Sequence, residues 1–546
     1  MKRAIILLAL VVIVALPFAL RRSTGGAPAA DDTLVIVTPN NEAIRHEIGL
    51  AFTRWYRAHT GRSIAIDWRV LGGTSEISRF LEGEYTAAFR RRWTTNLHGA
   101  WNAEVQAAAQ DGNLGADAPQ RAREARAAFL ASNVGCGIDL FFGGDAYTFA
   151  DHARAGRLVR SAIMETHPEW FADGVIPRVH AGETYWDRDG RWFGYVLGSY
   201  GILYNRDALR RLGLASPPAQ WADLADWRYV GELALCDPTK SGSMTEAFEN
   251  VIQQQMHASW RRLQAAQPDV PAANLETAAV AAGWMDGLRL LQQLGANARY
   301  FSDTSQKPPI DVAAGNCAAG MCIDFYGRGQ VEATTRRGGS DRLGFAAPPG
   351  GTAYSVDPVG ILRGARHRPA AEAFIEFLLS LEGQRLWSQK PGTPSGPEQY
   401  ALRRLPVRRD FYAHEEWRGF RSDPEVDPYA ASAALVYQPA WTGGLFREIA
   451  FIARVMCQDT QEELRRAWQA IHAPGVEAAR AAAATRILQD LSFVSYDQAR
   501  TTIKAALEVK DKAAELRLAR ELGDRFRRQY TTAAAIARGE AVAPRD

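Results

Sequence analysis

Apolar and polar residues follow two different periods near the start of the chain. The apolar run Leu34–Val37 predicts a β-strand, and the polar turn Pro39–Glu42 ends it. Over Ile44–Tyr56, apolar residues recur every three or four positions, which predicts an amphipathic helix. Ile64–Val70 alternates like a second strand, and Glu76–Phe80 begins another helix. This β-α-β-α order indicates a parallel sheet covered by helices.

Polar residues stand where these strands end. In such sheets, ligands gather at the carboxyl ends of the strands. Asn41 follows the first strand, and Gly73, Thr74 and Ser75 follow the second. Asp145 follows a later apolar run in the same way, where it either accepts a hydrogen bond from a ligand or caps a helix. Ordinary turn chemistry explains each residue singly as well as ligand contact does.

A second candidate loop lies in the middle of the chain. Glu232–Cys236 is a candidate for a buried strand, and a helix is expected from about Met244. Between them lie Ser241, Gly242 and Ser243. A strand, a Ser/Gly turn and a helix N-terminus together favour anion binding, because the N–H groups of the first helical turn are unpaired. The alternative is that a serine only caps the helix, and both roles are compatible.

Other polar and aromatic candidates follow later strands. Gly315–Asp324 predicts a strand, with Asp324 and Tyr326 at its carboxyl end. Further upstream, four residues of one β-prone run cannot all belong to the core, so one or two of them are expected to face a ligand: Tyr195, Ser199, Tyr200 and Tyr204. We take Tyr200 as the candidate.

Two regions are rich in alanine and charge and have helical spacing. Residues 86–133 resemble a helical insertion with a solvated face. Near the end of the chain, Phe446–Trp468 and Arg480–Tyr530 predict a helical extension. The sequence leaves open whether this extension packs on the preceding domain or meets a partner.

Four segments occur in an order that resembles a known family. They are GILYN at Gly201–Asn205, WADL at Trp221–Leu224, DPTKSG at Asp237–Gly242 and AEAFIEFLLSLEGQ at Ala371–Gln384. The chain from about Thr33 to Tyr412 resembles extracellular solute-binding proteins of ABC importers, in the group that includes ferric-ion binders. The resemblance implies an α/β, two-lobed periplasmic-binding-protein fold (type II-like), in which each lobe is a mainly parallel sheet flanked by helices.

The resemblance also implies the domain order. It places a crossing strand at Arg191–Tyr204 and a return crossing at Ala353–Leu362. The expected parts are a signal peptide or N-terminal membrane anchor (1–30), the first part of lobe 1 (31–197, with the insertion at about 86–133), lobe 2 (198–345), the return of lobe 1 (346–440) and a C-terminal helical extension (441–546).

Length and charge restrict the remaining possibilities. The 546 residues exceed one ordinary hydrophobic core. The 64 basic and 61 acidic residues are too evenly balanced to favour nucleic acid or a membrane surface as partner. A basic start, Lys2-Arg3, precedes the apolar stretch Ala4–Leu20, and Ala27–Ala29 offers a cleavage pattern. Both a cleaved signal and an uncleaved anchor fit, and either indicates export to the periplasm.

Catalytic and metal-binding motifs are missing from the sequence. TKSGS at Thr239–Ser243 is not the G-x-S-x-G turn of hydrolases, and there is no phosphate-binding Walker A sequence. The five cysteines lack the spacing of a zinc site, although Cys317 and Cys322 are close enough in sequence for either a disulfide or two free thiols. We therefore predict no catalytic residues and no cofactor.

The predicted function is capture of a small solute between two lobes and delivery to an ABC permease. The alternative is an exported sensory or scaffold protein that binds a partner through its C-terminal helices. Ferric-ion binders of the family commonly use adjacent tyrosines, whereas here Asp324-Phe325-Tyr326 has one. Binding of Fe(III) is still compatible with the sequence if Tyr200, Asp324 and Tyr326 lie close together in the fold. The Ser/Gly/Thr-rich loops favour a phosphorylated or carboxylated organic anion.

Overall fold

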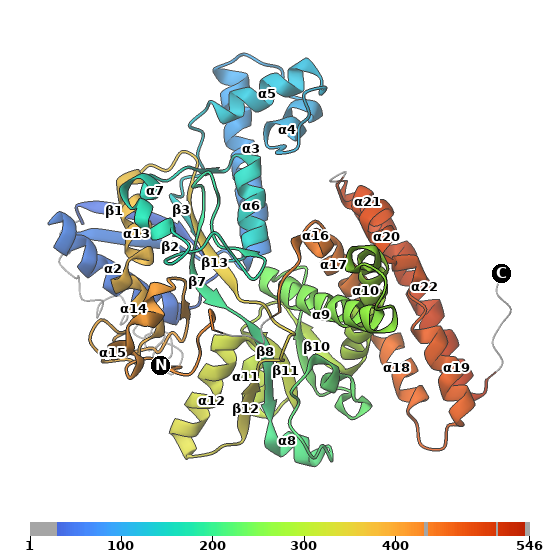
Figure 1. Cartoon of the computed structure of the whole chain (residues 1–546). Coiled ribbons are helices and arrows are strands. Elements are labelled where there is room, and N and C mark those ends of the chain that lie inside the picture. The colour runs from blue at the N-terminus through green and yellow to red at the C-terminus, as the bar shows by residue number, and fades with distance from the viewer. Residues whose placement is uncertain (1–29, 431–434, 509–510, 541–546) are drawn as a thin grey trace, which may run out of the picture.

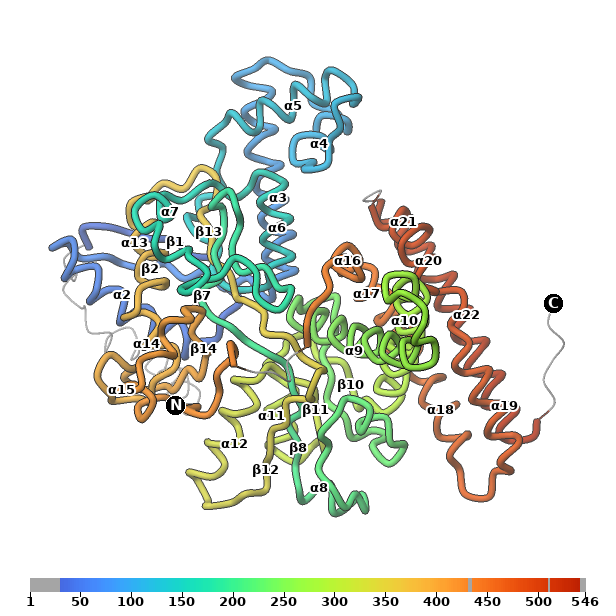
Figure 2. The backbone as a smooth tube through the Cα atoms, in the orientation of Figure 1, coloured from blue at the N-terminus to red at the C-terminus, as the bar shows by residue number. Residues whose placement is uncertain are grey.

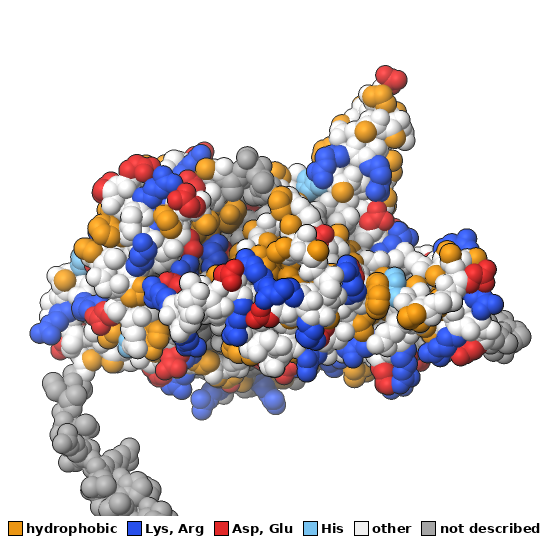
Figure 3. Space-filling view, turned by 90° about the horizontal axis from the view of Figure 1, so that it is seen from below, with side chains coloured by type: hydrophobic (Ala, Val, Ile, Leu, Met, Phe, Trp, Pro, Cys, Tyr) orange, Lys and Arg blue, Asp and Glu red, His pale blue; other side chains and the backbone are white. Residues whose placement is uncertain are grey.

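Two lobes and a C-terminal helical region make up the molecule. The structure is a computed structural model and describes residues 30–430, 435–508 and 511–540. In Figure 1, lobe 1 lies at the upper left, lobe 2 below it, and the orange and red C-terminal helices at the right. On the face shown in Figure 3, basic and acidic side chains are interspersed, in keeping with the net charge of +3.

Lobe 1 is built on a seven-stranded sheet of order β14-β7-β13-β3-β1-β2, with β4 paired to β13. Its strands are β1 (Asp32–Val37), β2 (Ile64–Arg69), β3 (Leu140–Phe142), β4 (Leu158–Val159), β7 (Phe193–Gly198), β13 (Ser355–Leu362) and β14 (Leu405–Pro406). A separate hairpin pairs β5 (Val179–His180) with β6 (Glu183–Thr184). Strand β1 is parallel to β2 and to β3.

Helices cover this sheet, and their aromatic faces meet in the core. Phe52 packs edge-on against Phe374, with ring centroids 4.9 Å apart. The helices of lobe 1 are α2 (Glu42–Thr60), α3 (Thr74–Thr95), α4 (Ala103–Ala109), α5 (Gln120–Leu130), α6 (Ala146–Ala155), α7 (Ile163–Thr166), α13 (Arg368–Leu379), α14 (Leu381–Ser388) and α15 (Glu415–Arg418). The end of α3 with α4 and α5 projects from the top of lobe 1, where the sequence predicts a helical insertion (Figure 1).

Lobe 2 is built on a five-stranded sheet of order β10-β9-β11-β8-β12. Its strands are β8 (Tyr200–Asn205), β9 (Leu233–Cys236), β10 (Ala298–Ser302), β11 (Ala319–Ile323) and β12 (Leu343–Ala346). Its helices are α8 (Arg206–Arg211), α9 (Gly242–Ala266), α10 (Ala272–Asn297), α11 (Lys307–Ala314) and α12 (Asp324–Gly338). Short 3-10 turns in the two lobes are η1 (Pro168–Phe171), η2 (Trp221–Ala225), η3 (Trp227–Tyr229) and η4 (Asp410–Ala413).

The chain passes between the lobes at places that lie close together (Figure 2). Ser199 alone separates β7 from β8, and residues 347–354 join β12 to β13. These two crossings are bonded, since Tyr200 N donates to Thr352 Oγ1 at 2.8 Å. Leu435, which leads into the C-terminal helices, also lies at these crossings, since its N–H donates to Thr352 O.

Both sheets are mixed rather than mainly parallel, which corrects one part of the fold prediction. In lobe 1, β13 is antiparallel to β3 and β7, and in lobe 2, β8 is antiparallel to β11 and β12. The reason is the crossing itself: β8 and β13 enter a lobe from the other one and so run against its own β-α-β strands. The two-lobed α/β class is confirmed.

The C-terminal helices belong to the core of lobe 2. Trp468 Nε1 donates to Asn297 Oδ1 at 3.0 Å, and Gln292 Nε2 donates to the Tyr530 hydroxyl at 3.1 Å. Phe526 and Tyr530 are fully buried in one apolar cluster with Trp284 of α10. These helices are α16 (Pro439–Thr442), α17 (Phe446–Ala453), η5 (Arg454–Gln458), α18 (Gln461–Ile471), α19 (Ala478–Leu488), η6 (Ser492–Val494), α20 (Tyr496–Gln498), η7 (Ala499–Ile503), α21 (Lys504–Glu508) and α22 (Lys512–Arg538).

Two expectations about export concern the ends of the fold. Across the described ranges, we find no helix with the length and apolar character needed to cross a membrane. The expected signal peptide or anchor falls on residues 1–29, which lie outside the described residues.

All five cysteines are free thiols, so Cys317 and Cys322 do not form the disulfide that their spacing allows.

Candidate functional site

A cavity of about 680 Å³ lies between the lobes and is lined by residues of both. Lobe 1 contributes the loops after β1 and β2, together with Asp357 of β13 and Arg404, which immediately precedes β14. Lobe 2 contributes the loops after β9 and β10 and the start of α12. These loops follow the carboxyl ends of parallel strands, where ligands bind in open α/β sheets.

Four described helices begin at this cavity: α2, α3, α9 and α12. The Asn41 side chain caps α2 by accepting from Ile44 N at 3.0 Å, and Gly73 N donates to Glu76 Oε2 at 3.1 Å. At the N-cap of α9, by contrast, the Ser241 side chain caps no N–H group of the helix. Helix N-termini carry partial positive charge and unpaired N–H donors, so this arrangement favours an anion.

Arg404 brings a buried positive charge to the cavity. It is 3% exposed, and its Nη2 lies 2.8 Å from Asp357 Oδ1. Its guanidinium lies 4.4 Å from the centroid of the Phe325 ring, and its Nε finds no hydrogen-bond acceptor among the described residues. Burial raises the pKa of Asp357, and the neighbouring guanidinium partly offsets this rise. Arg404 therefore has donor capacity that a ligand anion can use.

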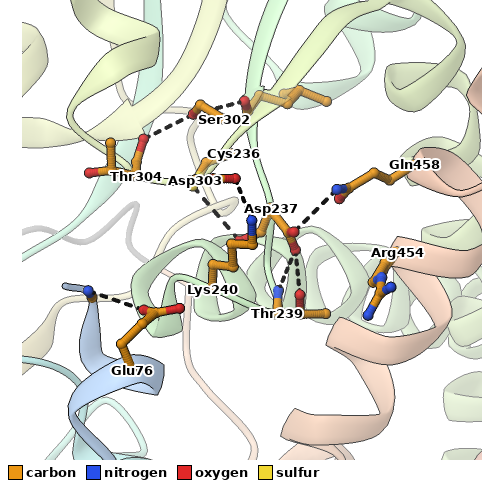
Figure 4. A network of polar contacts seen from close by, with 12 residues as sticks. Glu76, Cys236, Asp237, Thr239, Lys240, Ser302, Asp303, Thr304, Arg454 and Gln458 are labelled. Atoms are coloured by element: carbon orange, nitrogen blue, oxygen red, sulfur yellow. Dashed lines mark hydrogen bonds and ion pairs between the residues drawn. The ribbon is translucent and has the colours of Figure 1, made fainter. Parts of the chain in front are cut away.

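Lys240 lies in the loop before α9, and polar contacts with neighbouring elements hold this loop in place (Figure 4). Its Nζ lies 2.5 Å from Asp303 Oδ1. Asp237 accepts hydrogen bonds from Thr239 N at 2.8 Å and from Thr239 Oγ1 at 2.6 Å. Gln458, from the C-terminal helices, donates to Asp237 Oδ2 at 3.2 Å. The C-terminal region thus holds the shape of a cavity loop.

Six of the predicted ligand-binding residues line this cavity. They are Asn41, Gly73, Thr74, Ser241, Ser243 and Tyr326. Burial raises the pKa of Tyr326, so its hydroxyl is neutral at neutral pH.

The other five predicted residues lie outside the lining. Ser75 follows Thr74 in the first turn of α3. Asp324 is buried at the hinge, where it accepts from Ser199 Oγ at 3.3 Å and from Arg328 Nη2 at 2.8 Å. Tyr200 is buried and donates its hydroxyl to Glu246 Oε2 at 2.9 Å. The remaining two, Asp145 and Gly242, meet at the contact between the lobes.

Two glycines let the lobes approach each other. A Cβ on Gly242 would lie 2.1 Å from Asp145 Oδ2, and a Cβ on Gly73 would lie 2.8 Å from the Lys240 carbonyl oxygen. Both distances are too short for non-bonded atoms, so a side chain at Gly73 would displace the backbone at Lys240, and one at Gly242 would displace Asp145 or separate the lobes. Asp145 also caps α6 by accepting from Thr148 N at 2.7 Å, and burial raises its pKa to about 6.

Sequence patterns missed several residues of the lining. Arg404 and Asp357 come from the return of lobe 1, and Thr304 from the loop after β10. Lys240 also lines the cavity, although it is not among the ligand-binding residues that the sequence predicts in the loop before α9. A cluster of arginines, from Arg403 to Arg409, was the available signal for Arg404, although a run of positive charge is more often a solvated surface.

The fold and the cavity define a two-lobed α/β binding protein with its site between the lobes. A family model described as bacterial extracellular solute-binding protein matches residues 138–412, and the chain belongs to this family. The family expected from the sequence is thereby confirmed, and it is a family of binding proteins.

Curated relatives match parts of the chain. An uncharacterized protein of Haemophilus influenzae is 26% identical over 253 residues, which cover 46% of this chain and 61% of that protein. The phosphoglycerate transport regulatory protein PgtC of Salmonella typhimurium is 27% identical over 191 residues, which cover 35% of this chain and 39% of that protein. The chain thus spans less than two thirds of the length of these relatives.

Solved structures of binding proteins are also similar. The periplasmic binding protein AfuA from Actinobacillus pleuropneumoniae, with fructose-6-phosphate bound, is 16% identical with a TM-score of 0.47, covering 80% of this chain and 98% of that one. Iron-bound HitA from Pseudomonas aeruginosa is 17% identical with a TM-score of 0.45, covering 78% of this chain and 99% of that one.

Proposed function

We propose that the protein captures a small organic anion, one that carries a phosphate or carboxylate group, in the cavity between its lobes. The observation that carries the proposal is the convergence of four helix N-termini with Arg404 on one cavity of about 680 Å³. This volume falls within the range of about 300–1,000 Å³ that is typical of small-molecule sites.

Hydrogen-bond donors from several elements point into the cavity between the lobes. The first N–H groups of a helix and the helix dipole both favour negative charge, and the uncapped start of α9 at Ser241 leaves such groups open. Arg404 and Lys240 are balanced by Asp357 and Asp303 when no ligand is bound. A ligand anion would replace these carboxylates as partner, and neutralisation of Asp357 is favoured by its raised pKa.

An organic anion fits the cavity better than Fe(III) does. Fe(III) prefers hard oxygen ligands such as phenolates and carboxylates, yet Tyr326 is the single tyrosine among the described lining residues. Asp324 and Tyr200, the other expected iron ligands, bond to Arg328 and Glu246. The name of the relative PgtC, a phosphoglycerate transport regulatory protein, agrees with a phosphorylated solute. We propose no cofactor.

We further propose that the loaded protein works in the periplasm and presents its solute to an ABC permease in the inner membrane. The residues before Ala30 would serve as a cleaved signal or as a membrane tether. A second candidate is an exported sensory protein, because PgtC is named as a regulatory protein and because the C-terminal helices brace a cavity loop through Gln458. In that case the C-terminal helices would report the solute to a partner.

The first test is native mass spectrometry of residues 30–546, purified without refolding. A retained organic anion supports the proposal and identifies the solute class. A mass increment of iron, with a visible phenolate charge-transfer band, would overturn the preference for an organic anion.

The second test uses calorimetric titration with 3-phosphoglycerate and with inorganic phosphate. Replacing Ser241 and Ser243 together by alanine should weaken binding at least about tenfold, because the loss of even one hydroxyl hydrogen bond to a charged group costs about 1.5 kcal/mol or more. The melting temperature should stay unchanged. Ser75→Ala, at a helix start outside the lining, is the matched control. Equal affinity of the double variant and the wild type would remove the α9 loop from the site.

A further inference from the structure

A second cavity, of about 370 Å³, lies on the other side of the start of α9. Its walls come from three parts of the molecule: α6 and the β5–β6 hairpin of lobe 1, α9 of lobe 2, and residues 437–446 of the C-terminal region. Five acidic side chains line it: Asp187, which pairs with Arg191, and Asp145, Glu183, Glu246 and Glu249. This cavity is therefore chemically unlike the one between the lobes.

Protein donors hold three of these acidic groups in place. Asp145 accepts from the Thr148 hydroxyl at 2.9 Å in addition to its capping bond. Glu249 Oε1 accepts from the Tyr437 hydroxyl at 2.8 Å and from Thr442 Oγ1 at 2.5 Å. Glu246 accepts through Oε2 from Tyr200, whereas its Oε1 is buried and has no hydrogen-bond partner in the described part of the chain.

Glu183 is the exception. It is 9% exposed and lines the cavity, yet its carboxyl group forms no hydrogen bond or ion pair with a described residue. Burial and the neighbouring Glu246 and Glu249 raise its pKa well above the usual range. Glu246 Oε1 and the Glu183 carboxyl both lack a partner among the described residues, and an unpaired buried polar atom is destabilising, so the cavity indicates a partner outside the chain.

The lining indicates which partner. Among the described residues, no group of three His, Cys, Asp or Glu side chains is arranged to hold a metal ion. Aromatic side chains complete the wall: Tyr147 stacks on Phe446 with ring centroids 4.6 Å apart, and Trp186 and Trp192 lie nearby. Carboxyl groups beside aromatic rings favour an organic ammonium group, which combines an ion pair with cation–π contact.

Arginines also border the cavity, but they reach solvent. Arg154 pairs with Asp151, and Arg191 pairs with Asp187. Arg188 is exposed and Arg178 is half-buried. Water screens the charges of these arginines, whereas Glu183 is 9% exposed and Glu246 Oε1 is buried, so the carboxyl groups mark the inner part of the cavity.

We propose that this second cavity binds a small organic ammonium ion, whose charged group pairs with Glu183 and Glu246 and whose aliphatic part packs against Tyr147 and Phe446. The ligand contacts both lobes and the C-terminal region at once. Its binding therefore holds these three parts together, independently of the solute between the lobes.

Calorimetric titration of residues 30–546 with 1,4-diaminobutane tests the proposal, with butane-1,4-diol as the uncharged isostere. The diamine should bind and the diol should not. Glu183→Gln keeps the size but cannot ionise beside an ammonium group, and it should weaken diamine binding at least about tenfold. Glu425→Gln, whose side chain is 82% exposed, is the matched control and should bind as the wild type does. Absence of diamine binding, or equal binding by Glu183→Gln, would overturn the proposal.

A second variant keeps the test decisive if Glu183→Gln does not fold, which circular dichroism reveals. Thr184→Trp places a large side chain at a half-buried position of the lining and fills the cavity. Loss of diamine binding in this variant supports the site. Unchanged binding shows that the diamine binds elsewhere and overturns the proposal.

Discussion

The two cavities lie on either side of one helix start, yet they have opposite chemistry. Ser241 and Ser243, at the first residues of α9, face the cavity between the lobes, which four helix N-termini make favourable for an anion. Glu246 and Glu249, one and two turns further along the same helix, line the second cavity. The helix thus offers backbone N–H groups at its end and carboxyl groups along its side.

This difference shows that the electrostatic character of a site depends on which part of a helix it contacts. The helix dipole acts only over the first turn, so it favours anions beside Ser241 and has little effect at Glu249. Gly242 approaches Asp145, which lines the second cavity, and the neighbours Ser241 and Ser243 of Gly242 line the first. Variants that act on one cavity alone therefore test whether the two are independent.

The largest effect is expected from Arg404→Ala. This change removes the buried cation of the first cavity and leaves Asp357 buried without its partner. Losing a buried charge pair with a ligand costs 2–5 kcal/mol, so affinity for 3-phosphoglycerate should fall about 100-fold or more in calorimetric titration. Binding of 1,4-diaminobutane should not change.

The control for this prediction is Arg409→Ala, which removes an exposed arginine of the same run. It should alter neither affinity. An Arg404→Ala protein that folds and binds 3-phosphoglycerate within about threefold of the wild type would contradict the assignment of the first cavity as the anion site.

A smaller effect is expected from Gly242→Ala. The added Cβ would lie 2.1 Å from Asp145 Oδ2, so the lobes must separate or Asp145 must move. We expect a larger radius of gyration by small-angle X-ray scattering and about tenfold weaker binding of 3-phosphoglycerate, because closure then costs more free energy.

A second substitution at Asp145, the residue that the added Cβ would meet, makes this test more specific. Asp145→Ala in the Gly242→Ala background should restore the wild-type radius of gyration. Gly329→Ala, where a Cβ meets nothing within 4 Å, is the control. If the single Gly242→Ala variant scatters as the wild type does, the wall between the two cavities is not rigid.

Local patterns in the sequence were sufficient to predict the helices and strands and the loops that follow the strand ends. The period of three to four over Ile44–Tyr56 falls within α2, and the polar residues after the first two strands, together with the Ser241 loop, lie at the first cavity. Each of these inferences needs only neighbouring residues, because strand ends and helix starts are local features.

Residues that depend on tertiary contact were not predictable in this way. Tyr200 lies in β8, which is buried on both faces, so alternation gives no indication of which side meets a ligand. Arg404 reaches the cavity only because the chain returns to lobe 1. The helical spacing of Arg480–Tyr530 predicts helices, but their apolar face is explained only by its packing on α10 within the core of lobe 2.

The smallest expected effect is a pH dependence of stability, which arises from the acidic residues of the second cavity alone. Burial raises the pKa of Glu249 to about 7 and that of Glu246 to about 8, whereas an unfolded chain ionises these groups near the ordinary value of 4.5. The folded state therefore binds more protons than the unfolded state between these values. Stability from the neutral groups is fully present below about pH 4 and is lost as the pH rises towards 8.

We expect the melting temperature to be a few degrees higher at pH 5 than at pH 8, since each 1 kcal/mol corresponds to about 1 °C in a protein of 546 residues and each shifted pKa unit to about 1.4 kcal/mol. Glu246→Gln, which mimics the neutral acid, should reduce this difference, and Glu425→Gln should not. Scanning calorimetry at both pH values measures the two slopes. If Glu246→Gln and the wild type lose the same stability between pH 5 and pH 8, Glu246 is already ionised at pH 5. An ammonium ion would then pair with a preformed carboxylate and would displace no proton.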